Sequence, residues 1–190
     1  MKFAIFASGS GSNAEQILRA VQNDELDGTP AFVFSDQRDA GVLSKAQQYE
    51  VTTYQFSPKQ FDSKAVFERA LLEKLQIHEV EWIVLAGYMR LIGEVLLSNY
   101  EGNIINIHPS LLPHYPGLDA IGRRLTDGAK ETGVTIHYVD RGMDTGPIIA
   151  QAALAIHPNE SKQQLAMRIQ QLEHQLYPKT LQTVFKEGEA

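Results

Sequence analysis

An amide, an imidazole and a carboxylate occur in an order that suits chemistry at a carbonyl carbon. Asn106 and His108 are two residues apart at the end of a short apolar run, residues 103–107, and Pro109 follows. If that run is a β-strand, both side chains project from one face, because side chains two apart share a face, and Pro109 ends the strand pairing. An amide can hold a developing oxyanion and an imidazole can move a proton. This pair predicts a group-transfer enzyme.

The carboxylate is Asp144, on a loop between Gly142 and Gly146. A carboxylate close to an imidazole favours the charged imidazolium and raises its pKa. Taken alone, Asp144 is better explained as a turn residue, and His108 as a structural histidine. The chemical interpretation therefore depends on whether the fold brings Asn106, His108 and Asp144 together.

A glycine-rich segment, residues 8–13, reads Ser-Gly-Ser-Gly-Ser-Asn and lies between an expected strand and an expected helix. Backbone amides in such a turn, together with the positive end of a helix dipole, can bind a phosphate. We expect a side chain at Gly11 to block the anion. The alternative is a tight turn with a Ser or Asn N-cap. The segment lacks the third glycine of a dinucleotide fingerprint and the Gly-Lys-Ser/Thr of a P-loop.

The elements that must position these residues alternate along the first two thirds of the chain, which predicts an open, mostly parallel α/β sheet. Residues 134–139 and 148–156 follow as an expected antiparallel strand pair. A capping box from Ser161 to Gln164 opens a long C-terminal helix, which Pro178 should kink or interrupt. The expected strands are 3–7, 31–34, 51–56, 82–86 and 103–107, and the expected helices are 14–21, 41–50 and 61–76.

No repeat, low-complexity tract or linker divides the chain, so we expect a single domain, 1–190. Its N-terminal part, about 1–100, would be phosphate-binding, and its C-terminal part, about 101–190, would be catalytic. The chain is 43% hydrophobic, with a net charge of -6 and no cysteine. That composition excludes disulfides and thiolate metal sites and argues against nucleic-acid binding. No apolar run reaches the roughly 20 residues of a membrane span. We expect a cytoplasmic protein, monomer or homodimer, that acts on small molecules.

The chain resembles the phosphoribosylglycinamide formyltransferases, the folate-dependent formyl-transfer enzymes of purine synthesis. The resemblance covers nearly the whole chain and is strongest in the Asn-x-His-Pro-Ser-Leu-Leu-Pro run, 106–113. It implies a Rossmann-like fold, 10-formyltetrahydrofolate as co-substrate, glycinamide ribonucleotide as acceptor, and neither metal nor covalent intermediate. The other matching segments are 9–13, 85–90 and 137–147.

The resemblance also implies roles for individual residues. Asn106 would polarise the formyl oxygen, His108 would transfer the proton, and Asp144 would support His108. The residues implied to hold the ribose phosphate and the ribose are Gly11, Ser12, Asn13, Gln170 and Glu173. The residues implied to contact folate are Lys64, Met89, Arg90, Leu91, Ile92 and Asn106.

Several relatives place a histidine shortly after the Gly117 turn, where this chain has Asp119 and Ile121. That difference puts a secondary histidine in doubt and leaves the Asn106–His108 pair untouched. Three alternatives remain. They are another formyl-folate enzyme, such as a formyltetrahydrofolate hydrolase or a methionyl-tRNA formyltransferase, a dinucleotide-binding oxidoreductase, and a non-catalytic folate or nucleotide sensor.

Overall fold

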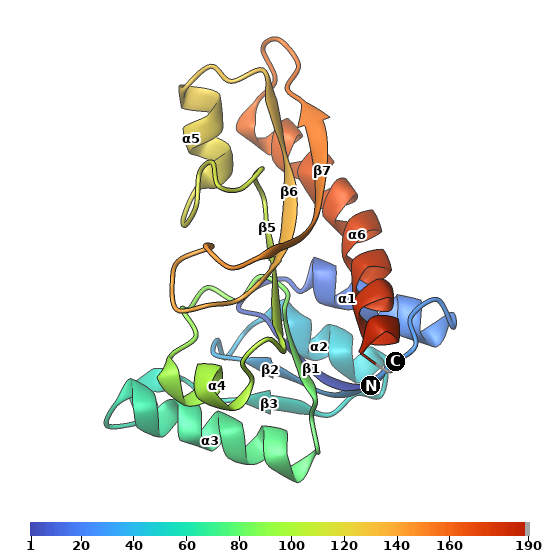
Figure 1. Cartoon of the computed structure of the whole chain (residues 1–190), viewed down its shortest axis with the longest axis vertical. Coiled ribbons are helices and arrows are strands. Elements are labelled where there is room, and N and C mark those ends of the chain that lie inside the picture. The colour runs from blue at the N-terminus through green and yellow to red at the C-terminus, as the bar shows by residue number, and fades with distance from the viewer. Residues whose placement is uncertain (189–190) are drawn as a thin grey trace.

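A seven-stranded sheet forms the centre of the structure, a computed structural model that describes residues 1–188 (Figure 1). The strands are β1 (Lys2–Phe6), β2 (Thr29–Ser35), β3 (Thr53–Gln55), β4 (Trp82–Leu85), β5 (Ile104–His108), β6 (Glu131–Tyr138) and β7 (Ile148–Ala155). Their order is β3-β2-β1-β4-β5-β6-β7. The first five strands in this order are parallel, whereas β6 is antiparallel to both β5 and β7. The predicted mostly parallel α/β sheet with an antiparallel pair is confirmed.

Helices cover both faces of the sheet, and the side chains of each strand alternate between them. The helices are α1 (Ser12–Gln22), α2 (Gly41–Gln48), a 3₁₀ turn η1 (Pro58–Gln60), α3 (Lys64–Ile77), α4 (Glu94–Asn99), α5 (Ala120–Thr126) and α6 (Lys162–Glu187). Phe3 and Ile5 of β1 belong to one core cluster with α1, α2 and α6, whereas Ala4 and Phe6 belong to a second cluster with α3 and α4. Figure 1 shows α3 and α4 together at the lower left and α6 on the right-hand side.

The long helix α6 begins as the sequence predicts and continues past Pro178, where we expected a kink or an interruption. The capping box is present, because Ser161 Oγ accepts the Gln164 N–H while Gln164 Oε1 accepts the Ser161 N–H. Pro178 lies inside the helix, which runs on to Glu187, so the expected interruption is wrong. Burial on both sides of the proline explains this. Tyr177 is fully buried, and its hydroxyl donates to the carbonyls of Leu85 and Ile105.

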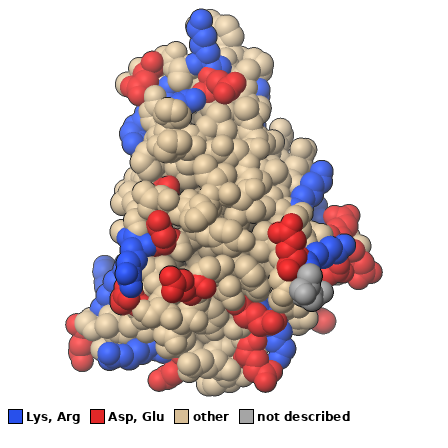
Figure 2. All heavy atoms as spheres, viewed as in Figure 1, with Lys and Arg blue, Asp and Glu red and all other residues tan. Residues whose placement is uncertain are grey.

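The helices α4 and α5 were not predicted, because they have only six and seven residues. Segments that short carry too few turns for hydrophobic periodicity to show. Within the described residues 1–188, no helix combines the length and apolar composition needed to cross a bilayer. On the face seen in Figure 2, acidic and basic side chains lie interspersed around the periphery, and a broad uncharged band crosses the middle.

Candidate active site

A cavity of about 500 Å³ lies where the parallel strands β4 and β5 end. Ligands of open α/β sheets bind at this carboxyl edge. The segment 87–92 forms one wall, and the segments 106–109 and 117–121 and the loop 139–144 form others. Asn13 and Glu173 line the cavity from α1 and α6. Six separate parts of the chain thus meet around one space.

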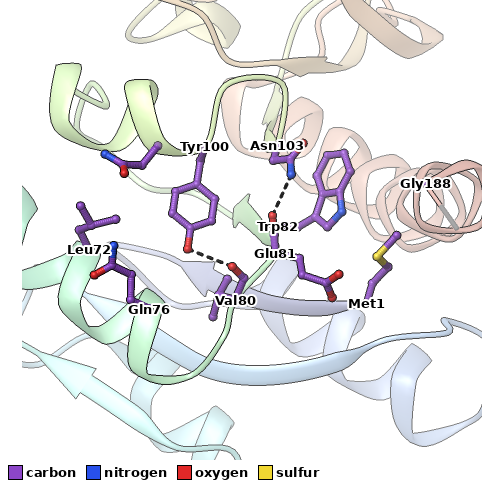
Figure 3. Close-up of a pocket in the computed structure, with 10 residues that line it drawn as sticks. Met1, Leu72, Gln76, Val80, Glu81, Trp82, Tyr100, Asn103 and Gly188 are labelled. Carbon is purple, nitrogen blue, oxygen red and sulfur yellow. Dashed lines mark hydrogen bonds between the residues drawn. The ribbon is translucent and has the colours of Figure 1, made fainter.

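A second cavity, of about 530 Å³, lies near the opposite ends of the strands, around Trp82 and Tyr100 (Figure 3). Its polar side chains mainly support the backbone. The Tyr100 hydroxyl donates to the carbonyl of Val80, and the Asn103 amide donates to the carbonyl of Glu81. The described residues that line this cavity include neither a histidine nor any residue predicted for chemistry, so the first cavity is the candidate active site.

Asn106, His108 and Asp144 meet inside the first cavity, as the strand-and-loop argument required. His108 Nδ1 lies 3.4 Å from Asp144 Oδ2. Asn106 Nδ2 lies 3.5 Å from Asp144 Oδ1. Both side chains leave the same face of β5, and the loop carries Asp144 across to them. The structure therefore brings together the amide, the imidazole and the carboxylate in the order that the sequence suggested.

His137 is a fourth member of this cluster, and the sequence argument did not assign it a role. Its Nε2 lies 3.2 Å from Asn106 Nδ2 and 3.5 Å from Asp144 Oδ1. The antiparallel register of β5 and β6 pairs Asn106 directly with His137, so the two side chains share a face. Pairing of 103–107 with 134–139 would have revealed His137, but the sequence does not specify that pairing.

Burial and charge act in opposite directions on the two acid–base groups. Burial lowers the pKa of His108 from its ordinary value, although the Tyr115 carbonyl and the Asp144 charge both raise it. Asp144 raises the pKa of His108, as expected, but the loss of hydration on burial lowers that pKa by more. Burial raises the pKa of Asp144, yet contacts from His137 and the Gly117 N–H outweigh that and hold it at about 2. Asp144 is therefore a carboxylate at neutral pH.

Hydrogen bonds fix the orientation of both groups. His108 Nε2 lies 2.8 Å from the carbonyl oxygen of Tyr115, and because a carbonyl only accepts, that nitrogen carries a proton. The other ring nitrogen, Nδ1, then faces Asp144. Asp144 adopts a left-handed backbone conformation with φ 56°, and its Oδ2 accepts the Gly117 N–H at 2.7 Å. Asp140, the other acid on this loop, instead accepts the Gly142 N–H and the Thr145 hydroxyl.

The glycine-rich turn brings α1 against α6. Gln170 Nε2 donates to Ser12 Oγ at 2.8 Å, and Asn13 Nδ2 donates to Glu173 Oε2 at 2.9 Å. No side chain caps the start of α1. Asn13 Oδ1 is buried and has no hydrogen-bond partner among the described residues. Burial raises the pKa of Glu173, and the hydrogen bond from Asn13 offsets part of this.

Gly11 has a packing role that the sequence did not suggest. Its φ of 72° is in the left-handed region that favours glycine, and it immediately precedes α1. A Cβ at this position would lie 2.5 Å from Cβ of Val42 in α2. A side chain at Gly11 would therefore disturb helix packing before it obstructed a ligand. Gly11, Ser12 and Gln170 adjoin the cavity without lining it.

The wall formed by 87–92 includes four of the six predicted folate contacts. Met89 and Leu91 line the cavity and are 69% and 56% exposed, whereas Ile92 lines it and is buried. Arg90 also lines the cavity, but its Nε donates to Asp36 at 2.7 Å. Lys64 is not part of the lining, and its ammonium lies 3.9 Å from Glu68.

The departure from the family pattern at Asp119 has a structural role. Asp119 accepts the Gly122 N–H at the start of α5 and pairs with Lys162 at 2.7 Å. Ile121 lies beside it, and both line the cavity. Within residues 1–188, no group of three or more histidine, aspartate or glutamate side chains is arranged to hold a metal ion.

Comparisons with known proteins extend along almost the whole chain. Residues 1–181 match the formyl transferase family. A phosphoribosylglycinamide formyltransferase of Bacillus subtilis is 49% identical over 95% of this chain and 92% of its own length. Glycinamide ribonucleotide transformylase 1 from Geobacillus kaustophilus has a similar crystal structure, with 50% identity, a TM-score of 0.94, and coverage of 96% of this chain and 97% of that one. The trifunctional purine biosynthetic protein adenosine-3 of Drosophila melanogaster is 38% identical over 95% of this chain and 14% of its own length.

Proposed function

This chain belongs to the formyl transferase family, and we infer that it transfers the formyl group of 10-formyltetrahydrofolate to the amino group of 5-phosphoribosylglycinamide. The products are formylglycinamide ribonucleotide and tetrahydrofolate, and the reaction belongs to purine biosynthesis. Formyltetrahydrofolate hydrolysis, the alternative, is not favoured. The observation that carries this assignment is the meeting of Asn106, His108 and Asp144 in a cavity whose lining also includes Asn13 and Glu173.

The reaction needs one new bond, one broken bond and one proton moved. The neutral amine of the acceptor attacks the formyl carbon, and the carbonyl electrons move to the oxygen. The carbonyl then re-forms as the bond to N10 of the folate breaks. The proton lost from the amine balances the one gained by N10. The chain must therefore stabilise an oxyanion and carry a proton, and no activated Ser or Cys nucleophile is required.

We propose that Asn106 and His108 stabilise the oxyanion. Asp144 supports His108 and the path along which the proton leaves the amine. Asn106 Nδ2 contacts His137 at 3.2 Å and Asp144 only at the long distance of 3.5 Å. The longer contact is the one that a formyl oxygen can replace. Formyl-folate that fills the cavity places negative charge next to His108 as the reaction proceeds, which favours the imidazolium. Asp144, a carboxylate at neutral pH, then faces the charged ring.

The acceptor fits the end of the cavity near α1. Amides at the uncapped start of α1 suit the ribose phosphate, and Gly11, Ser12, Asn13 and Gln170 are the residues that we propose to surround it. The buried, unpartnered Asn13 Oδ1 calls for a donor from a ligand. Glu173, hydrogen-bonded to Asn13, is the proposed partner of the ribose hydroxyls.

The folate fits the wall formed by 87–92. Met89, Leu91 and Ile92 give the apolar surface that a planar ring needs, and Arg90 supplies a cation near the opening for a carboxylate. Lys64 remains a predicted contact for the same tail, from outside the lining. The division into a phosphate-binding part, about 1–100, and a catalytic and folate-binding part, about 101–190, remains a proposal. Residues from both parts line one cavity.

The chain acts on small molecules. We further propose that it acts in the cytoplasm, as a monomer or homodimer, without a nucleic-acid or membrane partner. The absence of cysteine supports the cytoplasmic location, and the net charge of -6 supports the absence of a nucleic-acid partner.

The decisive experiment compares two acceptors for the formyl group. Purified protein with 10-formyltetrahydrofolate is assayed for tetrahydrofolate release with and without 5-phosphoribosylglycinamide. We expect release to depend on the ribonucleotide and a stoichiometric formylated product. Release at the same rate in water alone would indicate a hydrolase instead.

A further inference from the structure

Two buried carboxylates lie outside the catalytic cluster. Asp36 and Glu68 are the acidic residues of the buried set within the described chain, with exposed fractions of 2% and 3%. Moving a carboxylate out of water is strongly unfavourable unless hydrogen bonds and charges compensate for the lost hydration. The groups that compensate show which part of the chain each carboxylate stabilises.

Asp36 follows β2 and fixes the beginning of the segment 87–93. Its Oδ2 accepts Arg90 Nε at 2.7 Å, and its Oδ1 accepts the Ser8 hydroxyl at 2.6 Å. Ser8 Oγ in turn accepts the Met89 N–H at 3.0 Å. One buried carboxylate therefore orients the side chain of Arg90 directly and the backbone of Met89 through a single hydroxyl.

Glu68 of α3 fixes the other end of the same segment. Its Oε1 accepts the Gly93 N–H at 2.6 Å, directly before α4 begins. A Cβ at Gly93 would lie 2.6 Å from Glu68 Oε1 and 2.7 Å from Oε2, so only a glycine allows this approach. The glycine and the carboxylate thus form a matched pair at the end of the wall.

We propose that Asp36 and Glu68 are positioning residues for the formyl donor, which hold both ends of the segment 87–93 so that its apolar side chains face the cavity before the folate binds. Met89 and Leu91 are 69% and 56% exposed, a conformation that the hydrophobic effect alone does not favour. Holding them in place in advance removes an ordering cost from binding. The proposal rests on the proposed function, since it assigns this wall to the folate.

The test separates binding of the donor from binding of the acceptor. Asp36→Asn keeps the size of the side chain but removes its charge. The new amide N–H groups would also face the Ser8 hydroxyl and Arg90 Nε, which are themselves hydrogen-bond donors. Hydrogen bonds to charged groups contribute enough that we expect the KM for 10-formyltetrahydrofolate and the Kd for tetrahydrofolate to rise about 10- to 100-fold. We expect kcat at saturation and the KM for 5-phosphoribosylglycinamide to stay within about threefold of wild type.

A matched pair of variants tests the other end. Glu68→Gln retains an oxygen for the Gly93 N–H and should bind tetrahydrofolate within about threefold of wild type, whereas Glu68→Leu should bind at least about tenfold more weakly. Ser8→Ala removes the hydroxyl that links Asp36 to the Met89 N–H but leaves the Asp36–Arg90 contact in place, so it provides a milder change in the same segment should Glu68→Leu fail to fold. Asp27→Asn is the control, because Asp27 is an exposed acid 3.7 Å from Lys186 and does not line the cavity.

Calorimetric titration with tetrahydrofolate makes the result independent of catalysis. If the wild-type protein binds tetrahydrofolate but does not formylate the ribonucleotide, the proposed function fails and the positioning role can still be measured. Unchanged tetrahydrofolate affinity in both Asp36→Asn and Ser8→Ala would overturn the positioning proposal. Equal losses for both substrates, together with a lower Tm, would also overturn it, because they would indicate a general role in folding.

Discussion

Replacing Asp144 by Asn removes a charge from the proposed catalytic cluster while keeping the size of the side chain and an oxygen for the Gly117 N–H. The carboxylate lies 3.4 Å from His108 Nδ1. At that distance, two unit charges attract by about 5 kcal/mol at an effective dielectric constant of 20 and by about 1 kcal/mol in water. Because Asp144 is partly exposed to an open cavity, we take an attraction of about 2 kcal/mol between the carboxylate and the imidazolium, which lies between these limits. The imidazolium population then falls about 30-fold at a pH where His108 is mostly neutral.

This loss should appear in the pH dependence of kcat. The proposed mechanism uses the protonated form of His108, which is present below its pKa. Removing the neighbouring negative charge lowers that pKa, so the descending limb of the profile moves to lower pH and kcat near neutrality falls about 30-fold. The affinity for folate should change less than kcat, because the charge acts in the transition state. Steady-state assays across pH, with an NMR titration of His108 in both proteins, measure each quantity.

Two results would refute the reasoning in different ways. An unchanged His108 pKa with a reduced kcat would mean that Asp144 acts by placing water or ordering its loop. Wild-type values for both would make Asp144 a turn residue only. Asp140→Asn is the matched control, because Asp140 lies on the same loop but accepts hydrogen bonds from Gly142 and Thr145. We expect its kcat to remain within about threefold of wild type.

Three further predictions concern single residues. His108→Ala should lower kcat at least about 100-fold with a normal circular dichroism spectrum, because acid–base and oxyanion contributions are each of that order. Turnover near the wild-type rate would exclude the mechanism. Gly11→Ala should lower the free energy of unfolding in urea by about 2–4 kcal/mol, from the left-handed backbone and the collision with Val42. A wild-type midpoint would contradict that packing argument. Burial lowers the pKa of His174, whose Nε2 is buried without a hydrogen-bond partner among the described residues. As pH falls, His174 therefore becomes protonated in the unfolded chain before it does so in the folded protein. The contribution of neutral His174 to the free energy of unfolding is fully present above about pH 6.5, and it is lost as pH falls through the pKa of the folded state. His174→Gln should flatten the decline in unfolding free energy between about pH 7 and pH 5, and parallel curves for the two proteins would show that His174 is not responsible.

Local patterns in the sequence predicted much of the fold. Apolar runs of strand length, helical periodicity and the capping box at Ser161 identified all seven strands and four of the helices. Each of these signals depends on residues close together in the chain. The same patterns failed to predict that the helix runs on past Pro178. A local rule disfavours proline inside helices, but here the helix is packed into the core on both sides of the proline, through the buried Tyr177 before it and the buried Leu181 after it.

The sequence by itself also determined which groups are available for chemistry. Asn106 and His108 share a face because they are two apart in a strand, and the resemblance to a formyl-transfer family supplied Asp144. Only the tertiary structure decided what surrounds them. The antiparallel register that places His137 opposite Asn106, and the contacts that Asp36 makes with Ser8 and Arg90, join residues 28 to 54 positions apart. Such contacts depend on strand order and helix packing, which are global properties of the folded chain, whereas periodicity and spacing record only local ones.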